Sequence, residues 1–327
     1  MVILGKTELE LPDVRRDILG TSDVDIFPLI WKKFKKLGYA TMLAEDEPSI
    51  GMFNLRMNGF DQQPTDHYMR PFWLALWESE IRKASPRFCT GNVPNHMYLL
   101  DYTKDFFDKY SNVSKFAFVF SSELTHWDNN PGEYADTDLV EFLEYFKKKG
   151  YLDNTVVILY ADHGARYSRV RNTVQGKMEE RLPMLSLTFP RQFKQKYPQL
   201  YKNLQKNSNR LTTPFDIHET LLHTLHLDRN KPSKDKMGRA FSLLEKVPAN
   251  RTCSSAHIDM HWCTCLKQFE LDSSDAHVQK SARALVQVIN KETEKVRDQC
   301  AKLKFKAIQH AYLVVPNEKV RVSNYYS

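Results

Sequence analysis

The sequence predicts a three-layer α/β/α fold, in which helices cover both faces of a mostly parallel sheet, followed by a small C-terminal α+β extension. Three observations predict this fold. Segments with helical spacing of apolar residues alternate with short apolar segments of strand length, which is typical of βαβ units. The short segments at 116–120 and 156–160 carry no charged residue, as expected for parallel strands buried on both faces. The length of 327 residues allows one large α/β domain or two ordinary ones.

The predicted helices and strands follow one another in a regular order. Most of the predicted helices lead through turn residues such as Gly38 and Gly150 into a predicted strand. Gly, Pro, Asn and aromatic residues crowd the segment 47–73, which predicts an ordered loop region. The predicted helices span 26–37, 99–110, 136–149 and 213–227, and the predicted strands span 39–44, 116–120, 156–160 and 182–190.

The last part of the chain differs from this alternating core. We place a boundary near Val247, so that the core spans 1–247 and a cysteine-containing extension spans 248–327. Within the extension, a helix is predicted over 275–300, and a short hairpin is predicted to turn at 316–318.

Charge and hydropathy argue against a nucleic-acid partner and against a membrane span. The formal net charge is +7, but Lys and Arg stand beside acids throughout, as in "KVRDQC". This mixture is typical of solvated faces, so we expect no nucleic-acid partner. There is no stretch of 18 apolar residues and thus no predicted membrane span. The opening "MVILGKTELELPDVRRD" also lacks the apolar core of a signal peptide.

The cysteines and the glycosylation sequons point to a secretory compartment. Three of the five cysteines, Cys253, Cys263 and Cys265, cluster with histidines, which is compatible with zinc or with disulfides. One residue separates Cys263 from Cys265, fewer than the usual two to four of a zinc turn, and this favours disulfides. Asn112 and Asn250 begin Asn-x-Ser/Thr sequons, so we expect an extracellular or lumenal glycoprotein.

The candidate metal site lies at the end of the strand predicted over 156–160. Asp162, His163 and Gly164 follow that strand directly, and ligands collect at the carboxyl ends of strands in parallel α/β sheets. A carboxylate oxygen and an imidazole nitrogen can bind one divalent cation such as zinc or manganese, if glycine allows the backbone to turn sharply. An Asp-His-Gly tripeptide is also typical of a plain turn. The apolar strand before it and the arginines after it favour the metal site.

Residues for binding an anion stand near both strand exits. Arg166 and Arg171 follow the Asp-His pair, and their guanidinium groups match the geometry of phosphate or sulfate oxygens. The exit of strand 116–120 carries His126, with Glu123 as its nearest acid. The alternatives are that the arginines face water and that His126 is an ordinary loop histidine bonded to the backbone.

Several motifs resemble known families. "VVILYADHGARY" resembles the Asp-His-Gly signature of the alkaline phosphatase superfamily, which includes sulfatases, phosphodiesterases and lipid-headgroup phosphotransferases. "AEDEPSIGMFN", "QPTDHYMRPFW", "SSELTHWD" and "DHGARYSRVRNTVQGKMEERLPML" are similar to a sulfatase-like animal family catalogued as a domain of unknown function, number 229. The resemblance implies that Asp162 and His163 bind the metal, with zinc as the ion and manganese or calcium as alternatives. It also implies that His126 faces the transferred group of a phosphate or sulfate ester, or alternatively binds a second metal with Glu123 as its nearest acidic companion.

The resemblance implies two further parts: an acidic metal ligand after a first strand, and a Thr, Ser or formylglycine nucleophile. The opening "MVILGKTELELP" is similar to a segment that follows this nucleophile in related sequences, so we expect the chain to start just after it and assign no catalytic residue. Two functions then compete. One is a metal-dependent phosphoester or sulfoester hydrolase or transferase that is incomplete in this chain and lacks part of the machinery for catalysis. The other is a non-catalytic secreted or membrane-associated binding protein that keeps the fold.

Overall fold

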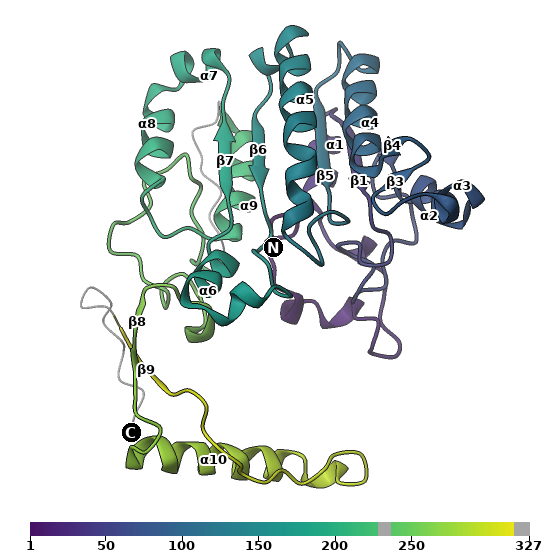
Figure 1. Cartoon of the computed structure of the whole chain (residues 1–327). Coiled ribbons are helices and arrows are strands. Elements are labelled where there is room, and N and C mark those ends of the chain that lie inside the picture. The colour runs from purple at the N-terminus through teal and green to yellow at the C-terminus, as the bar shows by residue number, and fades with distance from the viewer. Residues whose placement is uncertain (228–236, 317–327) are drawn as a thin grey trace. The chain divides into compact units, whose positions relative to one another are not determined.

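The computed structural model describes residues 1–227 and 237–316, and the chain divides into two compact units, Met1–Arg251 and Thr252–Ser327. The first unit is a mixed α/β structure built around a small parallel sheet (Figure 1). In this sheet β1 (Ala40–Glu45) lies between β2 (His67–Tyr68) and β5 (Lys115–Phe120) and runs parallel to both. Every residue of β1 is buried.

Helices cover both faces of this sheet. Successive side chains of a strand point to opposite faces, so Leu43 joins one buried apolar cluster and Met42 joins another. Aromatic residues such as Trp31 and Phe34 fill the first cluster, and Trp73 fills the second. The helices that supply these residues are α1 (Ile30–Lys36) and α9 (Pro214–Thr224) on the Leu43 face, and α2 (Arg70–Glu78), α4 (Asn95–Lys109) and α5 (Asp136–Lys148) on the Met42 face.

The strand that precedes the Asp-His pair belongs to a second, antiparallel pair. β6 (Val157–Tyr160) pairs with β7 (Leu185–Thr188) in antiparallel register, so the prediction of parallel pairing is wrong here. The connecting helix α6 (Val174–Arg181) lies beyond the ends of β6 and β7 rather than along their faces (Figure 1). Because α6 does not carry the chain back along the sheet as a crossover helix does, β7 returns beside β6 in the opposite direction.

The predicted full burial of the second and third strands is also wrong. Burial alternates along β5, where Val119 is 38% exposed, and all of β6 is half-buried. Within the described residues β5 pairs only with β1, and β6 only with β7. Each of the two strands therefore keeps one edge without a strand neighbour to cover it.

Two other boundaries differ from the prediction for local reasons. The first helix begins at Ile30 rather than at 26, because Pro28 disfavours a helical conformation in the residue before it. The predicted loop region 47–73 ends early, since α2 begins at Arg70 with Pro71 in its first turn. The remaining elements of the first unit are α3 (Glu80–Ala84), β3 (Cys89–Thr90), β4 (Val93–Pro94), α7 (Arg191–Lys196) and α8 (Pro198–Asn207).

A buried ion pair holds the end of the first unit. Arg251 donates from its two terminal nitrogens to the two carboxylate oxygens of Asp216, at 2.8 and 3.1 Å, and both side chains are almost fully buried. Asp216 also accepts hydrogen bonds from the backbone of Thr213 and Phe241. The pair thus ties α9 to the residues just before the cysteine cluster.

The second unit contains β8 (Leu266–Glu270), α10 (Ala276–Glu292) and β9 (Tyr312–Pro316). β8 and β9 pair in antiparallel register. The predicted turn at 316–318 extends beyond the described residues, and the strand before it, β9, pairs with β8. Among the described residues, every helix is too short or too polar to cross a membrane.

Candidate functional site

The exit loop of β5, which carries His126, is fastened to the end of β1. Asp46 is completely buried and follows β1 directly. Its carboxylate accepts hydrogen bonds from Ser121 Oγ (2.7 Å), Ser122 N (2.8 Å) and Ser122 Oγ (3.2 Å). Since buried carboxylates are costly unless they are hydrogen-bonded, these contacts fix where the loop leaves the sheet.

At the exit of β6, the carboxylate of Asp162 and the imidazole of His163 face each other. Asp162 Oδ2 lies 3.2 Å from His163 Nε2, with the acid 52% and the imidazole 34% exposed. Asp162 Oδ1 accepts the backbone N–H of His163 at 2.8 Å. The other ring nitrogen, His163 Nδ1, lies 2.8 Å from the carbonyl oxygen of Gly164. Both side chains are therefore oriented by the backbone and reachable from solvent.

Gly164 is needed for close packing rather than for an unusual backbone angle. It is not among the glycines with positive φ, so its backbone angle alone does not require glycine. Its N–H donates to the carbonyl of Glu180 at 3.1 Å. A Cβ at this position would overlap the carbonyl oxygen of Glu179 and lie 2.8 Å from Glu180 Cα. Only glycine lets the Asp-His segment lie against the C-terminal part of α6.

The two strand exits meet at His126. Its ring centroid lies 5.4 Å from that of Tyr167 in the loop after β6. Burial lowers the pKa of the His126 imidazole, and the positive charges of Arg166 and His163 lower it further, while Asp162 opposes them. These influences show that the four charged or titratable groups share one neighbourhood. His126 Nδ1 is buried and, within the described residues, has no hydrogen-bond partner.

Arg171 is placed differently from Arg166. Its Nε donates to Glu180 Oε2 at 3.1 Å, and the Glu180 carboxylate is 2% exposed. Arg171 thereby fixes the turn before α6, whereas Arg166 is exposed and its positive charge lowers the pKa of His126.

Sequence reasoning missed two aromatic residues at this site. Trp127 and Tyr167 are 60% and 59% exposed, and their ring centroids lie 5.3 Å apart. His126 packs edge-on against Trp127 at 4.5 Å. The signal was available, because one large aromatic directly follows each candidate residue, His126 and Arg166.

Three acids at the end of β1 were also missed, although acids at the end of a buried strand satisfy the same strand-exit rule: Glu45, Asp46 and Glu47. Burial raises the pKa of all three carboxyl groups and of Glu123. Glu123 is bound by Arg82 Nη2 at 2.9 Å and by the side-chain amide of Asn95. We expected His126 as the charged neighbour of Glu123, but its charged neighbours are Arg82 and Asp46. The acids therefore position the loop.

Comparison with known proteins now adds the family. The family model described as protein of unknown function (DUF229) matches residues 2–309. The chain belongs to the DUF229 family. No curated protein and no solved structure gives a significant match. The family level of the resemblance is confirmed, and the wider relation to alkaline phosphatases and sulfatases stays a prediction.

Two donor atoms of this DUF229 protein, one from Asp162 and one from His163, are spaced so that they can bind the same divalent ion. Two atoms about 2.1 Å from a tetrahedral zinc lie about 3.4 Å apart, close to the 3.2 Å between Asp162 Oδ2 and His163 Nε2. Ligating histidines usually donate their second ring N–H to a carbonyl or carboxylate, as His163 does to Gly164. In the part of the chain that the structure describes, no third His, Cys, Asp or Glu atom joins this pair closely enough to form a three-ligand group.

Two cysteines of the DUF229 chain form a disulfide, which agrees with the preference for a disulfide over a zinc site. Cys253 and Cys263 are bonded, and Cys89, Cys265 and Cys300 are free thiols. The three clustered sulfurs could otherwise hold a metal ion. A disulfide is compatible with a secreted or lumenal protein.

Proposed function

We propose that this protein binds a divalent cation through Asp162 and His163 and acts on a phosphate or sulfate ester, as a metal-dependent hydrolase or transferase. We propose zinc as the ion, or manganese or calcium in its place. With this function we propose the three-layer fold of the alkaline phosphatase and sulfatase type, a core over 1–247 and a location outside the cytoplasm. The cover of helices on both faces of the β1 sheet supports the proposed fold.

One observation carries the proposed cation site. A carbonyl oxygen only accepts, so His163 Nδ1 must carry the hydrogen that it donates to Gly164 O. In the neutral ring the lone pair is then on Nε2, and it faces Asp162 Oδ2, which is also an acceptor. Two acceptors at 3.2 Å are favourable only with a positive species between them. A shared divalent cation satisfies both atoms, and a second proton on His163 is the competing explanation.

The neighbouring residues support binding of an anion beside the cation. Arg166 offers an exposed guanidinium, whose paired donors suit phosphate or sulfate oxygens. A His126 imidazole whose pKa is lowered is neutral at neutral pH, and its unpartnered Nδ1 can bond to an ester oxygen. A divalent ion, when bound, would supply charge stabilisation to the ester oxygens. Arg171 remains a proposed substrate residue only if the anion competes with Glu180 for it.

Calorimetric titration with Mn²⁺ tests the cation site, because manganese prefers carboxylate and imidazole ligands to the thiols of this chain. We expect one site per chain, and Asp162→Asn or His163→Ala should weaken it by about tenfold or more. Asp128→Asn is the matched control, since Asp128 is exposed and its carboxylate accepts the Asn130 N–H, its one hydrogen bond within the described residues. Equal Mn²⁺ affinity in the wild type and in Asp162→Asn would refute the site.

The choice between catalysis and binding needs a second measurement. Nitrophenyl phosphate and nitrophenyl sulfate serve as test esters, with and without Mn²⁺. Metal-dependent turnover that is lost in Asp162→Asn supports the hydrolase. Binding of phosphate or sulfate without turnover supports the non-catalytic binding protein. In either case Arg166→Ala should weaken anion binding by about tenfold, and unchanged affinity would exclude Arg166 from the site.

A further inference from the structure

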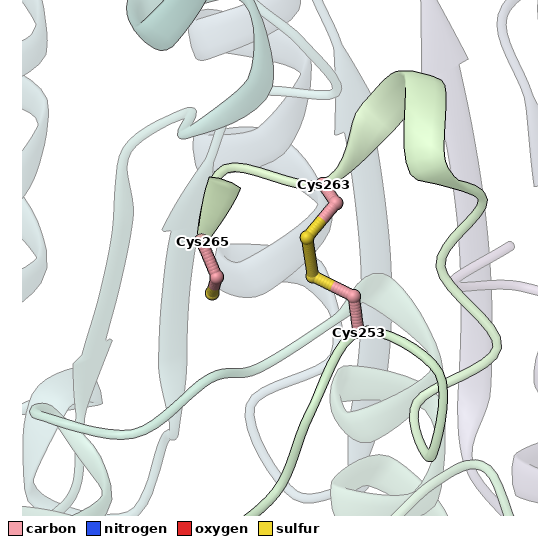
Figure 2. Close-up of side chains that lie close together, drawn as sticks. All are labelled: Cys253, Cys263 and Cys265. Carbon is pink, nitrogen blue, oxygen red and sulfur yellow. A yellow bond between two sulfur atoms is a disulfide. The ribbon is translucent and has the colours of Figure 1, made fainter. Parts of the chain in front are cut away.

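A free thiol lies directly beside the disulfide of the second unit. The sulfur atoms of Cys253, Cys263 and Cys265 all lie within 4.8 Å of one another, and Figure 2 shows the Cys265 side chain next to the bonded pair. Cys253 and Cys263 are each 5% exposed, while Cys265 is half-buried and reachable from solvent. No other group of three metal-ligating side chains comes this close within 1–227 and 237–316.

We propose that these three cysteines form a thiol–disulfide exchange site, in which Cys265 takes the place of Cys263 as the partner of Cys253. The Cys265 thiol gives its proton to water, and its thiolate attacks the sulfur of Cys253. The Cys253–Cys265 bond forms as the Cys253–Cys263 bond breaks, and Cys263 leaves as a thiolate that takes up a proton. One disulfide and one thiol are present before and after, so the step needs no oxidant or reductant.

The positions of the sulfurs favour this exchange over a fixed pairing. A separation of at most 4.8 Å is roughly 1 Å beyond van der Waals contact, so a small motion brings the thiolate to the disulfide. Cys263 and Cys265 are separated by one residue, between the short helix Met260–Trp262 and the start of β8. The residues that must move therefore lie in a connecting segment rather than inside a regular element.

Chain entropy distinguishes the two pairings very little. The present disulfide joins residues 10 apart in sequence, and the alternative joins residues two further apart. If the two pairings differed only in the entropy of loop closure, the equilibrium constant between them would differ from 1 by a factor of only about 1.3. Local packing must then decide the ratio of the two forms, and both forms can be populated.

The exchange would move the covalent tie by two residues along the chain. In the present form the tie ends before Thr264, and in the alternative it ends at Cys265, the residue before β8. On the other side, Cys253 stands two residues after Arg251, which is held by Asp216. After the exchange no residue separates the tie from β8, where two do in the present form, and Cys263 is the new thiol.

Thiol mapping on the full chain tests the proposal. The disulfide-containing protein is held at pH 8, quenched with acid, alkylated, digested without reduction and analysed by mass spectrometry. We expect the label on both Cys265 and Cys263, and a Cys253–Cys265 peptide beside the Cys253–Cys263 peptide. The approach to this mixture should slow on acidification, because only the thiolate form of a cysteine attacks a disulfide.

Single-cysteine variants make the result decisive. Cys263→Ser should form the Cys253–Cys265 disulfide and titrate with two free thiols, those of Cys89 and Cys300. Cys265→Ser should keep the present pairing and show no label at Cys263, and Cys300→Ser should exchange like the wild type. Label at Cys265 alone in the wild type overturns the proposal, as does a Cys263→Ser chain with four free thiols or with Cys300 in its disulfide. These readouts do not depend on metal or ester binding.

Discussion

Gly164→Ala tests whether close packing of the Asp-His segment on α6 determines the candidate site. The added methyl group would overlap the carbonyl oxygen of Glu179 and would lie 2.7 Å from the carbonyl carbon of that residue. These are backbone atoms of a helix, so no side-chain rotation can remove the overlap. The loop and α6 must separate instead, and this breaks the 3.1 Å hydrogen bond from Gly164 N to Glu180 O.

The magnitude follows from these distances. Ordinary contact begins near 3.4 Å, so the two backbone segments must move apart by at least about 0.7 Å. Overpacking of this kind costs about 1–3 kcal/mol, and the lost hydrogen bond adds about 1 kcal/mol. A destabilisation of about 2–4 kcal/mol should lower Tm by at least about 5 °C. The carbonyl of Gly164 that orients His163 moves as well, so Mn²⁺ affinity should fall by about tenfold.

Thermal unfolding followed by near-ultraviolet circular dichroism measures the effect, and Mn²⁺ titration measures its consequence for the site. Gly132→Ala is the matched control, because its Cβ meets only the methyl group of Thr125, at 3.1 Å. It should change Tm by less than about 2 °C. If Gly164→Ala unfolds at the same temperature as Gly132→Ala, the proposed packing of the loop on α6 is wrong.

Three further predictions concern other parts of the chain. Asp216→Ala leaves Arg251 buried without its partner, so the free energy of unfolding in urea should fall by about 3–5 kcal/mol. Burial raises the pKa of Glu47, so its contribution to stability is present at acid pH and is lost as the pH rises through the folded-state pKa. Glu47→Gln should therefore make the free energy of unfolding in urea depend less on pH between pH 4 and 7. Asn112 and Asn250 are exposed, and each should carry a glycan when the protein is made in the secretory pathway, so each Asn→Gln change should remove one glycan mass.

Each of these predictions has a control and a contrary result. Glu80→Ala, which breaks an ion pair with Lys83 in which Glu80 is 91% exposed, should cost less than about 1 kcal/mol, and an equal loss in Asp216→Ala would contradict the buried pair. Identical pH profiles of the wild type and of Glu47→Gln would show that Glu47 does not titrate with folding. Deglycosylation that leaves the mass of the secreted protein unchanged would exclude glycans at both asparagines.

The elements were predictable where the local pattern decides them. The strands at β1, β5, β6 and β7 and the helices at α4, α5 and α9 occur where apolar spacing and turn glycines place them. The pairing of β6 with β7 was not predictable, because strand direction depends on where the connecting helix packs. The half-exposure of Val119 depends on which strand neighbours are present, and the composition of the strand does not contain this information.

The candidate site divides in the same way. The adjacency of Asp162 and His163 at a strand end is a property of the sequence. The different roles of Arg166 and Arg171 cannot be found from the sequence, because both arginines follow the same motif. Of the two, Arg171 is bound by Glu180 on α6. Likewise Glu123 stands three residues before His126 and yet is held by Arg82 and Asn95 from other helices.

By itself, the sequence determined that this is a mixed α/β chain of the DUF229 family with an acid and an imidazole behind an apolar strand and with cysteines close enough in sequence to pair. Periodicity, turn residues and motif spacing are local, and local forces suffice to set them. Only the tertiary structure decided which nitrogen of His163 faces Asp162, which arginine stays available to an anion, and which sulfur remains a thiol. These outcomes depend on contacts between distant segments, such as Gly164 against α6, and such contacts exist only after the chain has folded.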